Sequence, residues 1–342
     1  MAITEVTSTD ALVSALKAAQ GGDVISAQGA FGAVTLKDIR PAGQVTIDGS
    51  RGAHFERIDL TGCMNLHFDH LSLWPLGPVV PPPIKLKDDG TPIGNGKANQ
   101  FLIMADPTSA NIEVSNCIFR GRKDSDGHPG WAMADWKNAQ IGAALMQCPG
   151  AVIRSNKAIG IYFGFTLAGK NSELFDNHLF GFAADGLRLT EDNCVCIGNR
   201  VTDAVRIDGN HPDAIQAFKR SGPLKGIIIK DNVLLEWTVR NNNPLRAKLQ
   251  GIGFYDGPYS DVVIRDNKVA ISSPNGIRIN ATTNITVTGN RVRHIDHART
   301  DYPRIMLTGC SGLIDVSNNR AEKFVPPNVG TNNGKPNYSE VF

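Results

Sequence analysis

The hexapeptide Ile285-Thr286-Val287-Thr288-Gly289-Asn290 is one copy of the unit that decides the fold. Its first and third residues are apolar and share one face of a strand, because side chains alternate along a strand with period two. A unit of this kind, repeated at short intervals, is typical of a solenoid in which each repeat packs on its neighbours. Six further copies end at Asn156, Asn177, Asn199, Asn232, Asn267 and Asn319.

The intervals between these asparagines are 21, 22, 33, 35, 23 and 29 residues. The shortest intervals indicate an obligatory coil, and the longer ones indicate loops inserted into it. A second apolar stretch precedes each unit, as in Ile277-Arg278-Ile279, and a third follows the asparagine, as in Arg291-Val292-Arg293. Three strands this short bury their apolar faces only when the coils stack. We therefore predict an all-β fold, a single-stranded right-handed parallel β-helix.

The asparagines are expected to be structural, because stacked amides can satisfy the backbone groups of a buried turn and one another. Cys117 and Leu71 hold the asparagine position in two units that we interpret as earlier coils. Cys194 and Cys196 occupy the two inward positions of their unit, which predicts core thiols rather than a metal or redox pair. At one turn we predict a stack of the amides of Asn177, Asn199, Asn232, Asn267 and Asn290.

The N-terminal segment has the features of a helical cap. Between Thr9 and Gly22, the apolar residues Leu12, Leu16 and Ala19 form one stripe, and glycine follows. A solenoid needs such a cap because its end coil exposes core and unpaired strand edges. We therefore divide the chain into an N-terminal segment with a capping helix (residues 1–22), the β-helix domain (23–321) and a C-terminal tail (322–342).

The composition narrows the class of function. The chain has 342 residues, with Lys+Arg 35, Asp+Glu 33 and a formal net charge of +2. So balanced a charge provides no field for gathering phosphates, so we expect no nucleic-acid partner and no membrane surface. No apolar run approaches the length of about 18 residues that spans a membrane. The start MAITEVTSTD lacks the basic-then-apolar pattern of a signal peptide.

The capping segment, the stretches Gly21-Gly22-Asp23-Val24-Ile25 and Gly32-Ala33-Val34-Thr35-Leu36, and the asparagine-marked coils together resemble the pectate-lyase-like right-handed β-helix superfamily. The resemblance covers roughly residues 5 to 321. It implies a polysaccharide partner, because this superfamily contains polysaccharide lyases, glycoside hydrolases, uronan epimerases and phage tailspikes. Most of these bind acidic or bacterial-surface glycans in a groove outside one sheet. It also implies an extracellular or virion-associated location, and a homotrimer if the chain is part of a phage tail.

The candidate site must come from outward residues of the repeated strands, because a shared fold does not choose the activity. Alignment of the coils places Asp185, Asp213, Gln250 and Asn275 in one column. Three residues later, a second column contains Arg188, Gln216, Gly253 and Arg278. The structural alternative is that Asp213 binds turn amides and His211 is an exposed loop residue. The catalytic candidates are Asp185, Arg188, His211, Asp213, Lys219 and Arg278.

Three loop insertions enlarge the same region, at residues 74–99, 120–140 and 236–250. The tryptophans on the second and third could stack on sugar rings, because an aromatic face packs well on pyranose C–H groups. The alternative is that each indole attaches its loop to the coil. The candidates for substrate binding are Gln216, Trp131, Trp136, Trp237, Tyr255 and Asp256.

Three functions remain open, of which we favour a lyase acting on an acidic or bacterial-surface glycan. A lyase removes the proton α to a uronate carboxylate while arginine or a divalent cation neutralises that carboxylate; Arg188, Lys219 and Arg278 would supply the base and the clamp. A retaining glycoside hydrolase would use Asp185 and Asp213, because adjacent coils lie about 4.8 Å apart. The third function is a glycan-binding tailspike module without turnover. Calcium is the cofactor that carboxylates of different coils could hold, with Asp185 and Asp213 as the possible ligands in the lyase. No contiguous calcium-binding loop is present, so the metal ligands stay open.

Overall fold

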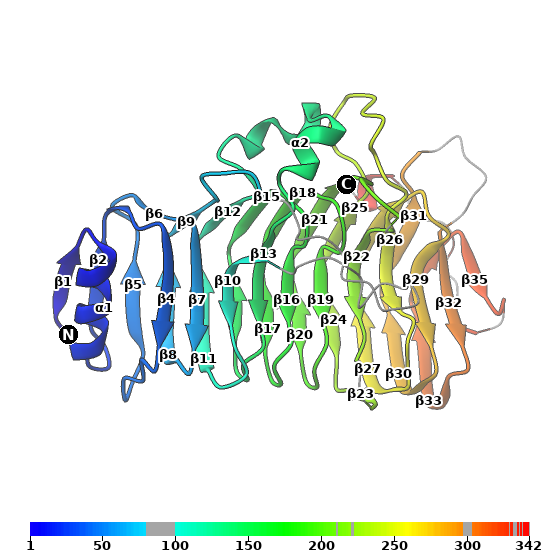
Figure 1. Ribbon diagram of the computed structural model, residues 1–342. Helices are drawn as coiled ribbons and strands as arrows, with labels where there is room; N and C mark the ends of the chain where they lie inside the picture. Colours follow the sequence, from blue (N-terminus) through cyan, green and yellow to red (C-terminus); the bar gives the residue numbers. More distant parts are fainter. Residues whose placement is uncertain are drawn as a thin grey trace, which may run out of the picture.

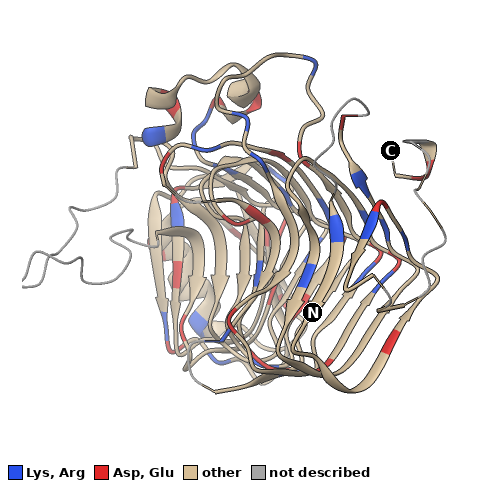
Figure 2. Ribbon diagram, turned by 90° about the vertical axis from the view of Figure 1, so that its right-hand side faces the viewer, with Lys and Arg blue, Asp and Glu red and all other residues tan. Residues whose placement is uncertain are grey.

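The computed structural model describes residues 1–79, 100–209, 211–219, 222–296, 303–327, 329–330, 334, 336 and 338–341. Part of the predicted insertion at 74–99 therefore lies outside the described residues. The chain forms a right-handed parallel β-helix whose coils follow one another along a single axis (Figure 1). Figure 2 looks roughly along that axis, and an apolar core fills the interior of the coils. The predicted fold class is confirmed.

Each full coil contributes one strand to each of three parallel sheets, in the chain order sheet 1, sheet 2, sheet 3. Sheet 1 contains β1 (Ile3–Val6), β2 (Val24–Ala27), β5 (Val45–Asp48), β8 (Met64–Asp69), β11 (Ala110–Ser115), β14 (Val152–Arg154), β17 (Glu173–Phe175), β20 (Val195–Ile197), β23 (Leu224–Lys225), β24 (Ile228–Lys230), β27 (Tyr259–Arg265), β30 (Thr282–Thr288) and β33 (Ser311–Ser317). Sheet 2 contains β3 (Gly29–Ala30), β6 (Ala53–Phe55), β9 (Ser72–Leu73), β12 (Ile118–Arg120), β15 (Lys157–Ile161), β18 (His178–Phe182), β21 (Arg200–Ala204), β25 (Val233–Leu235), β28 (Lys268–Ile271), β31 (Arg291–His294) and β34 (Arg320–Ala321). Sheet 3 contains β4 (Ala33–Lys37), β7 (Arg57–Thr61), β10 (Phe101–Ala105), β13 (Gly142–Met146), β16 (Phe165–Leu167), β19 (Leu187–Leu189), β22 (Asp213–Ala217), β26 (Gln250–Phe254), β29 (Asn275–Asn280), β32 (Arg304–Thr308) and β35 (Lys323–Val325).

The capping helix α1 (Thr9–Ala18) packs against β1 and β2 at the first coil, with Leu12 and Leu16 buried. Its first turn is capped by Ser8, whose Oγ accepts a hydrogen bond from the Ala11 backbone N–H at 3.3 Å. The other helices are short: η1 (Ser125–Gly130), α2 (Met133–Lys137) and η2 (Tyr338–Glu340). In the described part of the chain, none of the helices has the length and apolar character needed to cross a membrane.

The sheets extend past both limits of the segment 23–321. Strand β1 pairs with β2 before the helix, and β35 pairs with β32 within the C-terminal segment.

The asparagine stack is confirmed and explains how the turn between sheets 1 and 2 is satisfied. Asn199 Nδ2 donates to Asn232 Oδ1 at 3.0 Å, and the backbone N–H of Asn199 donates to the same oxygen at 2.9 Å. Cys117, at the asparagine position of an earlier coil, donates its backbone N–H to Asn156 Oδ1. Equivalent side-chain hydrogen bonds connect Asn156, Asn177, Asn199, Asn232, Asn267, Asn290 and Asn319 in order.

The cysteines of the repeat are also placed as predicted. Cys194 and Cys196 are fully buried in the apolar core, and burial raises the pKa of the Cys194 thiol to about 12. Both are therefore neutral core thiols.

Candidate functional site

The outer face of sheet 3 carries the second predicted column. The register pairs Arg188 of β19 with Gln216 of β22, Gln216 with Gly253 of β26, and Gly253 with Arg278 of β29. The adjacent residues of these strands point into the core and are buried. The predicted alignment of the coils is confirmed by this register.

A pocket of about 260 Å³ lies on this face, where strands β22, β26 and β29 begin. It brings together residues from three coils and from the turn after β26. Gln250 and Asn275 belong to it, although the sequence assigned them no role; the signal that could have found them is their position in the column that contains Asp213. The lining residues are His211, Gln216, Gln250, Tyr255, Asp256, Asn275 and Arg278.

An imidazole backed by a buried carboxylate forms one side of the pocket. The His211 side chain is 61% exposed, whereas that of Asp213 is 0% exposed, and His211 Nδ1 lies 3.4 Å from Asp213 Oδ2. The contact with Asp213 raises the pKa of His211 against the opposing effect of partial burial. Burial raises the pKa of Asp213, and the contact with His211 opposes that rise. The pair therefore presents the His211 imidazole to solvent and keeps the Asp213 carboxyl buried behind it.

Tyr255 and Arg278 form the other side. The Tyr255 hydroxyl donates hydrogen bonds to Gln250 Oε1 and, at 3.4 Å, to Asp213 Oδ1. Asn275 Nδ2 donates to the same Gln250 oxygen at 2.9 Å, which fixes the orientation of the amide. The Arg278 guanidinium lies 5.6 Å from the centre of the Tyr255 ring, and its buried Nε has no hydrogen-bond partner among the described residues. A cation and a hydroxyl are thus available beside the imidazole.

Asp185 and Arg188 lie on the preceding coil and do not line the pocket. Burial raises the pKa of Asp185 to about 6; the nearby Arg188 opposes this rise and Asp213 adds to it. Arg188 Nε donates to Thr166 Oγ1 at 2.9 Å, and its guanidinium lies 3.9 Å from the centre of the Phe163 ring. Asp185 therefore influences the pocket through its charge, which raises the pKa of His211, and Arg188 acts on Asp185.

Lys219 is not brought to the pocket. It follows the C-terminal end of β22, whereas Asp213 begins that strand, so the two are separated by roughly 20 Å along an extended chain. Lys219 Nζ lies 3.1 Å from Glu191 Oε2 and 3.3 Å from Asp192 Oδ1. The sequence could not reveal these partners because they lie on the turn after β19 of the neighbouring coil.

The three candidate tryptophans are buried rather than exposed in a groove. Trp131, Trp136 and Trp237 are 7%, 1% and 6% exposed and share a second apolar cluster. Trp131 and Trp136 pack edge to face at 5.0 Å between ring centres. Asn241, which accepts a hydrogen bond from Trp237 Nε1, also donates to the Pro129 carbonyl and so connects the loop after β25 with the loop that carries α2 (Figure 1). These are the contacts of rings that attach loops to the coil, and none of the three lines the pocket.

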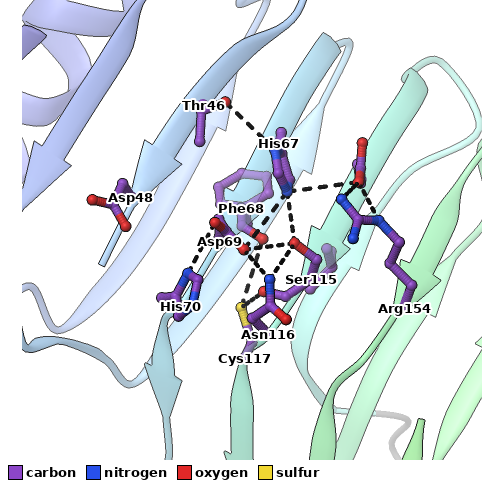
Figure 3. A network of polar contacts seen from close by, with 12 residues as sticks. Thr46, Asp48, His67, Phe68, Asp69, His70, Ser115, Asn116, Cys117 and Arg154 are labelled. Carbon is purple, nitrogen blue, oxygen red and sulfur yellow. Dashed lines mark hydrogen bonds and ion pairs between the residues drawn. The ribbon is translucent and has the colours of Figure 1, made fainter. Parts of the chain in front are cut away.

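A second polar network lies on sheet 1, near the N-terminal end of the β-helix (Figure 3). His67 Nε2 lies 2.7 Å from Ser115 Oγ, and Ser115 Oγ donates to Asp69 Oδ1 at 2.6 Å. Arg154 Nε donates to Glu113 Oε1 at 2.7 Å. The network connects β8, β11 and β14, and Ser115 is fully buried. We therefore assign it a structural role.

A metal site requires several ligand atoms that converge on one point. Within the described ranges, the group whose ligand atoms lie within 4.8 Å of one another consists of Asp48 and Asp69 of sheet 1 and of His70, which follows β8. Asp185 and Asp213 belong to no such group of three in the part of the chain that the structure describes. Calcium at the pocket stays a prediction.

Comparison with known proteins supports the architecture. No family model and no curated protein matches the chain. Among solved structures, the A-module of the mannuronan C-5 epimerase AlgE6 of Azotobacter vinelandii matches with a TM-score of 0.51 at 12% identity, over 96% of this chain and 90% of that chain. The surface adhesin PfbA of Streptococcus pneumoniae matches with a TM-score of 0.54 at 12% identity, over 93% of this chain and 81% of that chain. At this identity the likeness shows the fold alone: the chain is a right-handed parallel β-helix.

Proposed function

We propose that the chain is a polysaccharide lyase that cleaves an acidic glycan by β-elimination at the pocket on sheet 3. His211 removes the proton α to a uronate carboxylate; because Nδ1 faces Asp213, Nε2 is the nitrogen left for substrate. Arg278 neutralises the carboxylate. Tyr255 donates a proton to the departing glycosidic oxygen, while the electrons of the broken C–H bond form the new C=C bond and the C–O bond breaks.

The observation that supports this chemistry is the placement of the carboxylates. Asp213 is fully buried behind His211 and Tyr255, and neither Asp213 nor Asp185 lines the pocket. A retaining hydrolase needs two carboxyl groups that reach the glycosidic bond from either side. Asp256 is the one carboxylate residue among the described lining residues, and a single carboxyl does not make such a pair. An imidazole, a hydroxyl and a guanidinium also come from lining residues, and these are the groups that an elimination uses.

The test is a panel of acidic and neutral bacterial polysaccharides, followed both by the absorbance of unsaturated uronate and by new reducing ends. We expect both signals on an acidic glycan. Reducing ends without the absorbance would indicate hydrolysis, and binding without either would indicate a recognition module; both would overturn the proposal.

A matched pair of variants locates the activity. His211→Asn should abolish the absorbance. His70→Asn removes another exposed imidazole that contacts an aspartate, 2.9 Å from Asp69 Oδ2 on sheet 1, and should leave it unchanged.

A further inference from the structure

The outward column of sheet 3 is interrupted at one coil. Arg188, Gln216 and Arg278 extend side chains from neighbouring coils, whereas Gly253 occupies the same position on β26. Glycine in the interior of a strand is unfavourable, because it loses the most backbone freedom and packs no side chain. Its presence in this column therefore requires a local reason.

The backbone conformation does not provide that reason. Gly253 lies in a regular strand and outside the left-handed region that only glycine adopts readily. The nearby Gly251 has a different explanation, since an added Cβ there would lie 2.1 Å from the backbone oxygen of Gly276. At Gly251 the backbone of the next coil leaves no room for a Cβ atom. At Gly253 the obstacle to a Cβ atom is a neighbouring side chain.

That side chain belongs to Tyr255, two residues later on the same outer face. A Cβ added to Gly253 would lie 2.1 Å from Tyr255 Cε2, 2.6 Å from Cζ and 2.8 Å from the hydroxyl oxygen. The ring therefore leans back along the strand and occupies the space where any residue except glycine would carry its Cβ atom. This posture lets the hydroxyl reach Gln250 and Asp213, at the opposite end of the strand from the Tyr255 backbone.

We propose that Gly253 is a positioning residue, whose missing side chain makes the space that places the Tyr255 hydroxyl beside Asp213 in the pocket. The role in turnover rests on the proposed function; the placement of the ring does not. Gly253 touches no substrate and acts only through Tyr255.

The first test measures the ring without any substrate. Burial raises the pKa of Tyr255, so in the wild type this phenol does not ionise with an exposed tyrosine, near pH 10. In Gly253→Ala, an ultraviolet titration should show one more tyrosine ionising near pH 10. Adding Tyr255→Phe to that variant should abolish the extra signal. Gly130→Ala adds a methyl group that meets nothing within 4 Å and should titrate like the wild type. An unchanged titration of Gly253→Ala would overturn the proposal.

The second test uses turnover of the glycan found in the panel. Misplacing a reacting group by about 1 Å can cost about a hundredfold in rate, so Gly253→Ala should lower kcat by that order with a small change in KM. In the Tyr255→Phe background, the same substitution should have no further effect on kcat. Equal losses in both backgrounds would show that glycine acts independently of the hydroxyl. A panel without any turnover would contradict the lyase, while the titration would still decide the placement.

Stability provides the control for folding. Because the clash is with the ring, Gly253→Ala should lower the melting temperature when Tyr255 is present and have little effect in a Tyr255→Ala background. The same loss in both backgrounds would mean that the strand itself requires glycine, which overturns the proposal.

Discussion

Asp213 shows how one residue can combine a structural cost with a chemical use. It begins β22 with its side chain fully buried, yet its carboxyl contacts both His211 and Tyr255, which line the pocket. Oδ2 is buried, and its neighbour is His211 Nδ1 at 3.4 Å. A buried carboxyl with so few donors is costly, and such groups are concentrated at functional sites. We interpret Asp213 as the residue that orients His211 and tunes its basicity.

Asp213→Asn tests that interpretation at the level of the single charge. The amide keeps the size of the side chain but loses the charge, so turnover should fall by at least about a hundredfold. A base must be neutral, and the contact with Asp213 raises the pKa of His211, so wild-type activity should rise with pH through a value above 6.5. In Asp213→Asn this acid limb should move to lower pH. The control is Asp315→Asn, which removes an exposed carboxylate. If folded Asp213→Asn kept full activity and its acid limb stayed at the wild-type pH, the Asp213 carboxyl would only bind the turn.

Asp185→Asn should stabilise the protein, because the folded state holds this carboxyl at a pKa of about 6 against an ordinary 3.8. The unfolded chain loses the proton first, so the stability contributed by Asp185 falls as the pH rises from about 4 to about 6. The difference between these two pKa values sets an upper limit of about 3 kcal/mol on the stability that Asp185→Asn gains at pH 7. Urea unfolding at pH 4 and pH 7 measures it. A loss of stability at pH 7, or an equal gain at both values, would contradict the assignment.

Among the elements of the fold, the turn between sheets 1 and 2 can be predicted from the sequence because the hydrogen bonds that it needs come from a residue within the turn. The turn needs a side chain that both donates and accepts, and asparagine at a fixed offset after each strand supplies it. The strand register of sheet 3 follows from the same offset, which is why the sequence alone aligns the columns that contain Asp213 and Gln216.

The loops were not predictable in the same way. Whether Trp136 faces a sugar or the coil depends on contacts with residues distant in the chain, and no periodicity encodes those contacts. The partners of Lys219 on the neighbouring coil are hidden for the same reason. Tyr255 and Asp256 were found because they directly follow a strand of the repeat, where the coil itself fixes their place.

Asn232→Ala tests the energetic weight of the stack. The substitution removes the acceptor of the Asn199 backbone N–H and the donor to the Cys196 carbonyl, both inside the core. Leaving buried polar groups unpaired costs about 1–3 kcal/mol each, so the free energy of unfolding should fall by about 2–6 kcal/mol. Asn242→Ala, at an exposed loop position, should change it by less than about 0.5 kcal/mol. Equal effects of the two substitutions in urea unfolding would show that the stack is dispensable.

The whole molecule is a one-dimensional stack, so its stability depends on what covers its ends. Leu12 and Leu16 of α1 are 1% and 2% exposed and cover the first coil. At the opposite end, Ile314 of β33 pairs in register with the buried Ile285 but is 40% exposed. The two ends are therefore unequal: one has its core covered by a helix, and the other leaves part of an inward position open.

Leu16→Asp should uncover the protected end. A charge placed between the helix and the first coil would detach α1, exposing the core and the backbone edge of the first strands, which are templates for pairing with another chain. We expect a lower melting temperature and a concentration-dependent increase in mass by light scattering. Ser14→Asp puts the same charge on the exposed face of α1 and should leave the protein unchanged in both measurements. A Leu16→Asp protein that melts and elutes like Ser14→Asp would show that the coils hold themselves together without the cap, and stability would then reside in the asparagine stack and the core alone.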